Sequence, residues 1–148
     1  MDANDGFREL DRQECLRPLP TVPVGRIVYT WQALPAVLPV NFCLDGDGDD
    51  AVLVRTSDSA ELVSGIDGAV VAFEADEIDT TAHSGWSVVV MGSATLVRDP
   101  AEHARLLRTG PRSWAPAPQE VFLRIDPEVV SGRGLVGGRT LYGVDLPP

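Results

Sequence analysis

Apolar and β-branched residues concentrate in six stretches of the chain, each separated from the next by residues that favour turns. Stretches of this kind, rich in valine, isoleucine and aromatic residues, are typical of β-strands. One of them is apolar at almost every position up to Phe73, which is the pattern of a strand covered on both faces. The predicted strands are residues 24–30, 34–44, 51–56, 68–76, 86–97 and 119–126.

Two of these strands contain residues that disturb a regular ladder. Pro35 and Pro39 lie in the second strand, and proline has no N–H to donate to a neighbouring strand. We therefore expect this strand to be irregular, or to lie at an edge, near Pro39. Gly92 lies in the middle of the fifth strand and predicts a bulge or a bend of the barrel wall.

Three shorter segments carry the signals of helix ends. Asp11 and Glu14 have the spacing of a capping box, which predicts a helix of one or two turns before the prolines that follow. The other predicted helices are residues 59–66, with Ser57 or Asp58 as N-cap, and 100–109, opened by Asp99-Pro100. This arrangement predicts a mostly β fold with short helices, a six-stranded antiparallel barrel with helices at its openings.

The length of 148 residues is that of a single domain. We expect the folded domain to span residues 10–133, with a flexible N-terminus at 1–9 and a glycine-rich tail at 134–148. The N-terminal sequence lacks the basic and apolar regions of a signal peptide, and no apolar run has the length of a membrane span. We therefore expect a cytoplasmic protein without a membrane partner.

The net charge is −10, and all twelve basic residues are arginine. An acidic chain without basic clusters repels phosphate backbones, which argues against a nucleic-acid partner. The absence of lysine excludes Schiff-base chemistry on a lysine and any lysine anchor for a phosphate group.

No metal site or catalytic constellation is predicted from residue spacing. The segment DGDGDD at 45–50 superficially resembles a calcium loop, but its glycines have the wrong offsets, and we interpret it as a solvated hairpin turn. Cys15 and Cys43 have no metal or redox spacing and are expected to be unlinked thiols. His83 and His103 are expected to be solvated.

Five motifs follow one another in a distinctive order. They are VGRIVYT at 24–30 after a short leading helix, LPVNF at 38–42, RTS at 55–57 before a helix, GWSVVVMGSATLV at 85–97 and FLRIDPEVVSGR at 122–133. In this order the chain resembles the pyridoxamine 5′-phosphate oxidase-like family, whose members form FMN-binding split β-barrels. The resemblance covers residues 10–133, most of the chain.

The resemblance implies a homodimer with two equivalent sites at the subunit interface, each holding FMN. It places three groups of residues around the flavin. Pro39, Val40 and Asn41 would lie along the isoalloxazine ring, Arg55, Thr56 and Ser59 would meet the phosphate, and Trp86, Ser87 and Val88 would close the ring edge. Arginine, hydroxyl groups and the free N–H groups of a helix start are suitable phosphate ligands.

The chain departs from the family pattern at Glu61, where relatives commonly have a lysine that contacts the phosphate. A carboxylate in place of an ammonium group changes the local charge by two units beside a dianion. Either Glu61 turns into solvent and leaves Arg55 to hold the phosphate, or the site binds FMN weakly, binds another ligand or is vacant. Arg55 itself is either this ligand or a strand-end arginine paired with an aspartate.

Three hypotheses about function follow from these residues. The first is an FMN-dependent oxidoreductase that acts on an unknown small molecule, since the cofactor supplies the redox chemistry and few catalytic side chains are needed. The second is a deazaflavin- or haem-binding relative, which would require a wider basic groove or an axial ligand from His83 or His103. The third is a cofactor-free barrel used for binding or regulation, which Glu61 favours.

Overall fold

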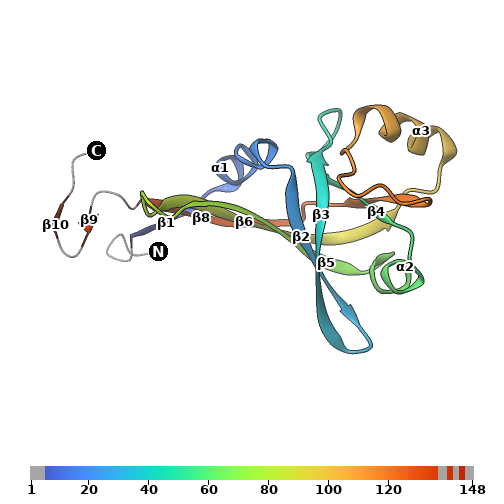
Figure 1. The fold of residues 1–148 in the computed structure, drawn as a ribbon, viewed down its shortest axis with the longest axis horizontal. Coiled ribbons are helices and arrows are strands. Elements are labelled where there is room, and N and C mark those ends of the chain that lie inside the picture. Colours follow the sequence, from blue (N-terminus) through green and yellow to red (C-terminus); the bar gives the residue numbers. More distant parts are fainter. Residues whose placement is uncertain (1–5, 137–139, 142–143, 146–148) are drawn as a thin grey trace.

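The computed structural model describes residues 6–136, 140–141 and 144–145. Strands dominate the described part, with short helices between them (Figure 1). In chain order, the elements are β1 (Phe7–Leu10), α1 (Arg12–Leu16), the 3-10 helix η2 (Leu19–Thr21), β2 (Val24–Trp31), β3 (Leu34–Leu44), β4 (Val52–Ser57), α2 (Ala60–Ile66), β5 (Val70–Asp79), β6 (Ser84–Leu96), α3 (Pro100–Thr109), β7 (Glu120–Ile125), β8 (Val129–Val136), β9 (Thr140–Leu141) and β10 (Val144–Asp145).

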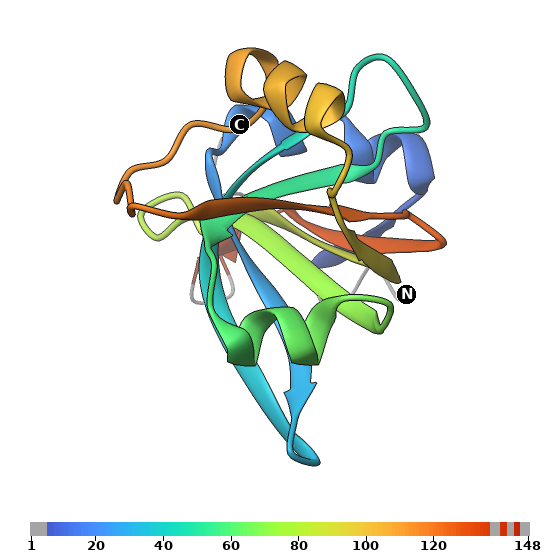
Figure 2. The ribbon, with the colours of Figure 1, turned by 90° about the vertical axis from the view of Figure 1, so that its right-hand side faces the viewer.

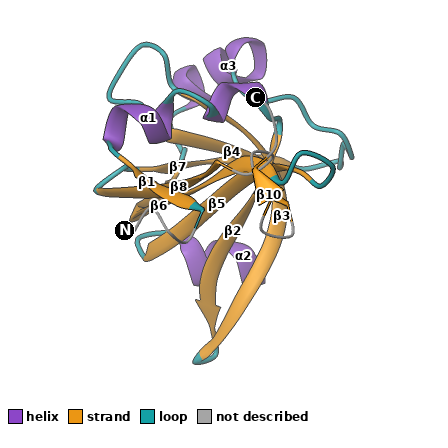
Figure 3. Cartoon of the chain, turned by 90° about the vertical axis from the view of Figure 1, so that its left-hand side faces the viewer, coloured by secondary structure: helices purple, strands orange, loops and turns teal. Residues whose placement is uncertain are grey.

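Six strands close into an antiparallel barrel. Each pairs with the next in the order β5, β2, β3, β4, β7, β6, and β6 returns to β5. Helices α1 and α3 lie on one side of this barrel and α2 lies on the other (Figures 2 and 3). The predicted six-stranded antiparallel barrel with short helices is confirmed.

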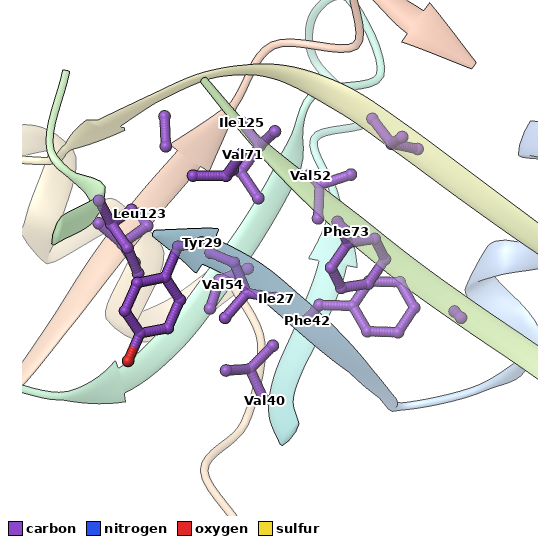
Figure 4. Close-up of a cluster of buried hydrophobic side chains, with 14 of the residues drawn as sticks. Ile27, Tyr29, Val40, Phe42, Val52, Val54, Val71, Phe73, Leu123 and Ile125 are labelled. Carbon is purple, nitrogen blue, oxygen red and sulfur yellow. The ribbon is translucent and has the colours of Figure 1, made fainter. Parts of the chain in front are cut away.

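The barrel is filled by the inward-facing residues of its strands (Figure 4). Phe42 of β3 and Phe73 of β5 pack with ring centroids 4.7 Å apart. Leu62 and Ile66 of α2 are buried against the same core, and each such side chain contributes about 1.5–3 kcal/mol on burial. The pattern of apolar residues in the sequence therefore marks the interior of the barrel.

Strand β6 changes partner halfway along its length. Residues Ser84–Met91 pair with β8, and Ala94–Leu96 pair with β7. The change falls at Gly92, where a Cβ atom would collide with the carbonyl group of Asp126. Only glycine allows this close approach of the chain between β7 and β8, which accounts for the bend predicted there.

Strands β8 and β1 extend the sheet beyond the barrel. β8 pairs with the first half of β6, and β1 pairs with the outer side of β8. Together these strands form an arm that projects from the barrel (Figure 1). Neither strand is predicted from the sequence. β8 has no apolar alternation in Ser131-Gly132-Arg133-Gly134, and most of β1 lies in the segment expected to be a flexible N-terminus. The predicted flexible N-terminus and tail fall in large part outside the described residues.

The two prolines of β3 lie where the strand has a neighbour on one side. β2 pairs with β3 from Leu34 to Asn41, whereas β4 pairs only with residues from Asn41 to Leu44. Pro35 and Pro39 therefore lie on a segment with a free edge among the described residues, and the prediction of an edge near Pro39 is confirmed.

The acidic hairpin at 45–50 is held by arginines. The buried carboxylate of Asp45 accepts a hydrogen bond from Arg124 Nη1 at 2.6 Å, and Arg105 lies 3.6 Å away. The hydrogen bond from Arg124 holds the pKa of Asp45 below its usual value. The interpretation as a purely solvated turn is therefore wrong for Asp45, because distant arginines bind this end of the hairpin to β7 and α3.

None of the helices in the described part is long and apolar enough to cross a membrane. The cytoplasmic location and the lack of a nucleic-acid partner stay predictions. Cys15 is buried and Cys43 is half-buried, and both are free thiols.

Candidate functional site

The predicted site residues fall into two groups on one chain. The barrel group lies on β3, on β4, at the N-cap before α2 and on α2, and consists of Pro39, Val40, Asn41, Arg55, Thr56, Ser59 and Glu61. The arm group consists of Trp86, Ser87 and Val88, on the half of β6 that pairs with β8. β4 lies in the barrel and this half of β6 leads away from it (Figure 1). Val40 and Val88 nevertheless share the barrel core, against which Trp86 packs.

Arg55 is engaged within the chain. Its Nε and Nη2 atoms donate to the two carboxylate oxygens of Glu120 at 3.2 and 3.3 Å, and Nη1 donates to the carbonyl oxygen of Pro111 at 3.4 Å. The two side chains are only 19% and 11% exposed. Burial opposes ionisation of Glu120, but the hydrogen bonds from Arg55 and Ser113 hold its pKa below the usual value. Arg55 is thus a neutralised arginine, paired with a glutamate instead of an aspartate.

A hollow of about 460 Å³ lies beside this ion pair. Among the described residues, Arg55 is the only cation in its lining, which also contains the carboxylates of Asp58 and Glu120 and the ring of His103. His103 is half-buried, with its ring edge against Phe122 at a centroid distance of 5.2 Å, and is less solvated than predicted. The hollow offers little net positive charge to a phosphate dianion.

Ser59 and Glu61 both have partners within the chain. The Ser59 hydroxyl accepts a hydrogen bond from the Leu62 N–H at 3.1 Å, so Ser59 is the N-cap of α2, where Ser57 or Asp58 was expected. Burial, together with the charge of Glu61 and a hydrogen bond to it, raises the pKa of Tyr29. Glu61 is therefore turned toward Tyr29 on β2. Thr56 is half-buried on β4.

Asn41 connects β3 to the segment between α3 and β7. Its Oδ1 accepts a hydrogen bond from the Trp114 N–H at 2.9 Å, and its Nδ2 donates to the carbonyl oxygen of Pro23 at 3.5 Å. This bond explains why a polar residue lies between Val40, which is buried, and a buried phenylalanine. Pro39 is exposed beside it on the free edge of β3.

The arm group follows the alternation of its strand. Val88 is buried and Trp86 is half-buried on the face that continues the barrel interior, so Ser87 lies on the opposite face. Trp86 is opposite Gly134 of β8 in the strand register. This tryptophan therefore lies at the end of the apolar core, as a core aromatic would.

An apolar row crosses the outer face of five neighbouring strands. The register aligns Val37, Val28, Ala72, Met91 and Val129, on β3, β2, β5, β6 and β8. Three of these side chains are well exposed, with fractions of 62% for Val37, 39% for Met91 and 52% for Val129. We call these five residues the outer row. The outer row is not predicted from the sequence, since its members come from five separate segments.

A charged cluster lies directly beside the outer row. Arg26 of β2 is 3.2 Å from Glu74 and 3.6 Å from Asp76, both on β5. Burial and the neighbouring Asp76 carboxyl raise the pKa of Glu74 to about 7. Two carboxyl groups thus share one guanidinium group on this face.

Comparisons with known proteins identify the fold family. The sequence profile of pyridoxamine 5′-phosphate oxidase matches residues 11–134. The uncharacterised protein Rv0080 of Mycobacterium tuberculosis is 42% identical over 130 residues, covering 86% of this chain and 85% of that protein. An FAD binding protein of Mycobacterium smegmatis is 34% identical with a TM-score of 0.73, covering 86% of this chain and 98% of that one. A conserved protein of unknown function from Corynebacterium diphtheriae is 35% identical with a TM-score of 0.75, covering 89% and 100%. The chain belongs to the pyridoxamine 5′-phosphate oxidase family of split β-barrels.

Proposed function

We propose that this protein is a homodimeric flavoprotein in which the arm of one copy meets the barrel edge of the other around a bound flavin. The observation that carries the proposal is the outer row, which joins barrel and arm in one exposed apolar face. Of the arm group, Ser87 lies on this outer face, so a second copy would add its Ser87 to the barrel group.

The composition of this face supports association with an identical partner. An apolar row across five strands is flanked by Arg26 on one strand and by Glu74 and Asp76 on another, so the face carries both charges. A two-fold interface brings the same patch of each copy together, which requires such self-complementarity. A stable interface buries about 800 Å² on each partner, an area that a five-stranded face can supply.

The free edge of β3 supports flavin binding next to Pro39, Val40 and Asn41. On this side the strand has no neighbour up to Val40 among the described residues, and β4 joins it at Asn41. Backbone N–H and C=O groups at an unpaired edge are available to hydrogen-bond a ligand. A planar ring system with donors and acceptors along its edge, as in a flavin, matches this edge.

The charges of the barrel group favour FAD over the predicted FMN. FMN ends in a phosphate monoester that carries about −1.5 to −2 charges, as phosphate monoesters do near neutral pH. Arg55 is already neutralised by Glu120, Glu61 adds a carboxylate, and the chain has no lysine. The diphosphate of FAD carries a similar total charge but spreads it over two phosphates with one charge each, so no single point of the site has to hold a dianion. The M. smegmatis relative, itself an FAD binding protein, is consistent with this choice.

A flavin supplies the redox chemistry when it is bound. The residues of the chain would then orient the ring at the β3 edge and exclude water from it, and the proposed activity is oxidation or reduction of a small molecule. The deazaflavin and haem alternatives gain no support from the geometry. His83 lies exposed in a turn, and His103 packs on Phe122.

The test is a titration of flavin-free protein with FAD and with FMN, followed by flavin fluorescence, with the mass measured by sedimentation equilibrium. We expect a dimer that binds one flavin per chain, with FAD tighter than FMN. Tighter FMN binding would restore the prediction from the sequence. A monomer, or a protein that binds neither flavin, would contradict the proposal.

A further inference from the structure

A second groove lies on the arm, away from Arg55. It has a volume of about 450 Å³ and runs between the segment containing α1 and η2 and the strands β1, β6 and β8. Pockets for small organic ligands have volumes of about 300–1,000 Å³, so this groove is large enough for one small molecule. We call it the arm groove.

The floor of the arm groove is apolar. Leu10 of β1, Trp86 of β6 and Leu135 of β8 all line it. Trp86 is half-buried and packs against the barrel core, so one part of its indole is fixed while another part faces the groove. A fixed aromatic ring beside leucine side chains favours a ligand with its own apolar, preferably aromatic, surface.

Gly134 keeps this floor open although the fold does not require glycine there. A Cβ atom on Gly134 would meet the Leu10 side chain at 3.5 Å and the Arg8 carbonyl oxygen at 3.9 Å, both ordinary contacts, and the φ of Gly134 is not positive. Gly85 differs, because its φ is +149° and a Cβ atom would collide with the backbone of Glu77. Glycine is thus required at 85 by the backbone conformation and by the nearby backbone of Glu77. At 134 the backbone does not require glycine, and the missing side chain leaves open space above Trp86.

The rim of the groove is positively charged. Arg8 and Arg17 line it together with a single carboxylate, Glu14. Arg8 is paired with Glu14 at 2.6 Å. Arg17 is exposed, and no residue in the described part of the chain accepts a hydrogen bond from its guanidinium group. The groove therefore has one uncompensated positive charge in a protein whose net charge is −10.

We propose that the arm groove binds a small organic anion that has an apolar, aromatic body, such as an aromatic carboxylate. The body lies on Trp86 and Leu10, above Gly134, and the anionic group pairs with Arg17. Trp86 also belongs to the arm group, but its side chain lies on the inner face of the sheet, opposite the outer row, so binding in the groove does not require the flavin. The further interpretation of this groove as the substrate site of an oxidoreductase rests on the proposed function. In that case the substrate belongs to the class of small aromatic anions.

The experiment uses two fluorescent probes with the same ring system. Anilinonaphthalene sulfonate carries an anionic sulfonate, and N-phenylnaphthylamine lacks it. Both are titrated into the full-length protein, with and without saturating FAD, so that a failure of flavin binding leaves the result on the groove unchanged. We expect saturable binding of the sulfonate at one site per chain in both conditions.

Three variants test the assignment. Gly134→Leu fills the groove and should weaken both probes at least tenfold. Arg17→Gln should weaken the sulfonate about fivefold, as for an exposed charge pair, and leave the neutral probe within about twofold. Arg108→Gln removes an exposed arginine from α3, outside the groove, and should change neither probe. Circular dichroism checks the fold of each variant.

The proposal is overturned if Arg17→Gln leaves the affinity of the sulfonate unchanged or weakens both probes equally. This result remains decisive even where Gly134→Leu fails to fold, since Arg17 is exposed. It is also overturned if folded Gly134→Leu protein binds both probes as the original chain does.

Discussion

The hollow beside Arg55 and the arm groove have almost equal volumes, about 460 and 450 Å³, and each is lined by arginine. In the first, Glu120 holds the guanidinium group at two points, and the pair is largely buried. In the second, Arg17 is exposed and has no partner in the described part of the chain. An arginine in a hollow is thus a potential anion site only where no carboxylate occupies it first. The arginine that the family resemblance singles out is the less available one.

The junction between barrel and arm is the place where a substitution should have the largest effect. Gly92→Val would push a side chain into the backbone at Asp126, where β6 changes partner. We expect a loss of about 3 kcal/mol or more in the free energy of unfolding, measured by urea denaturation. Gly46→Ala is the control, because a Cβ atom there meets nothing within 4 Å. Equal stability of the two variants would show that the close approach at Gly92 is relaxed in solution.

Removing the charge of Glu120 should give the hollow beside Arg55 an unpaired arginine, as the arm groove has in Arg17 among the described residues. In Glu120→Gln, Arg55 loses its counter-charge, and we expect the free energy of unfolding to fall by about 1–2 kcal/mol. The affinity for FMN should rise at least about threefold, because the guanidinium becomes available to a phosphate dianion. The control Glu102→Gln breaks the pair with Arg105 on α3, outside the hollow. Unchanged FMN affinity in Glu120→Gln would place the phosphate elsewhere.

The stability of the protein should depend on pH through Glu74, which lies on the face shared by barrel and arm. Its pKa in the folded protein is about 7, above the ordinary value of 4.5. The stabilisation from its protonated form is therefore fully present below about pH 4.5 and is lost as the pH rises through 7. We expect Glu74→Gln to flatten this decline in urea denaturation between about pH 5 and pH 8, whereas Glu77→Gln, exposed on the same strand, should not. An identical decline in Glu74→Gln would assign it to another group.

The smallest expected effect is at Glu61. Glu61→Lys places a positive charge at the start of α2, and at low ionic strength we expect FMN affinity to rise about threefold, with less effect at high salt. Ser64→Lys adds the same charge one turn later on α2, at another exposed position. If both variants have the same effect, or none, residue 61 does not face the phosphate and its role is limited to the contact with Tyr29.

Local patterns in the sequence predict the barrel well because strand composition, proline positions and glycine positions depend on the conformation of the residues that carry them. The six strands have apolar, β-branched composition, Pro39 marks a strand edge, and Gly92 marks the bend. β8 is not predicted because a glycine in it is required by contacts with residues that are distant in the sequence. A Cβ atom on Gly132 would lie 2.9 Å from the sulfur atom of Cys15, 117 positions away in the chain.

The residues of the candidate site likewise have partners that are distant in the sequence. Arg55 meets Glu120 across 65 positions, and Asn41 meets Trp114 across 73. The motif around Arg55 can be recognised in the sequence, but the carboxylate that neutralises it cannot. For the same reason, the outer row and the arm groove become visible only when strands from distant parts of the chain are brought side by side.

The central claim is that the flavin site is completed by a second copy of the chain through the outer row. The most direct test is Met91→Asp, which places a charge in the middle of this row, with sedimentation equilibrium and an FAD titration on the same sample. The account predicts a folded monomer that has lost FAD binding, while the original chain is a dimer that binds FAD. A Met91→Asp monomer that binds FAD as tightly as the original protein would contradict it.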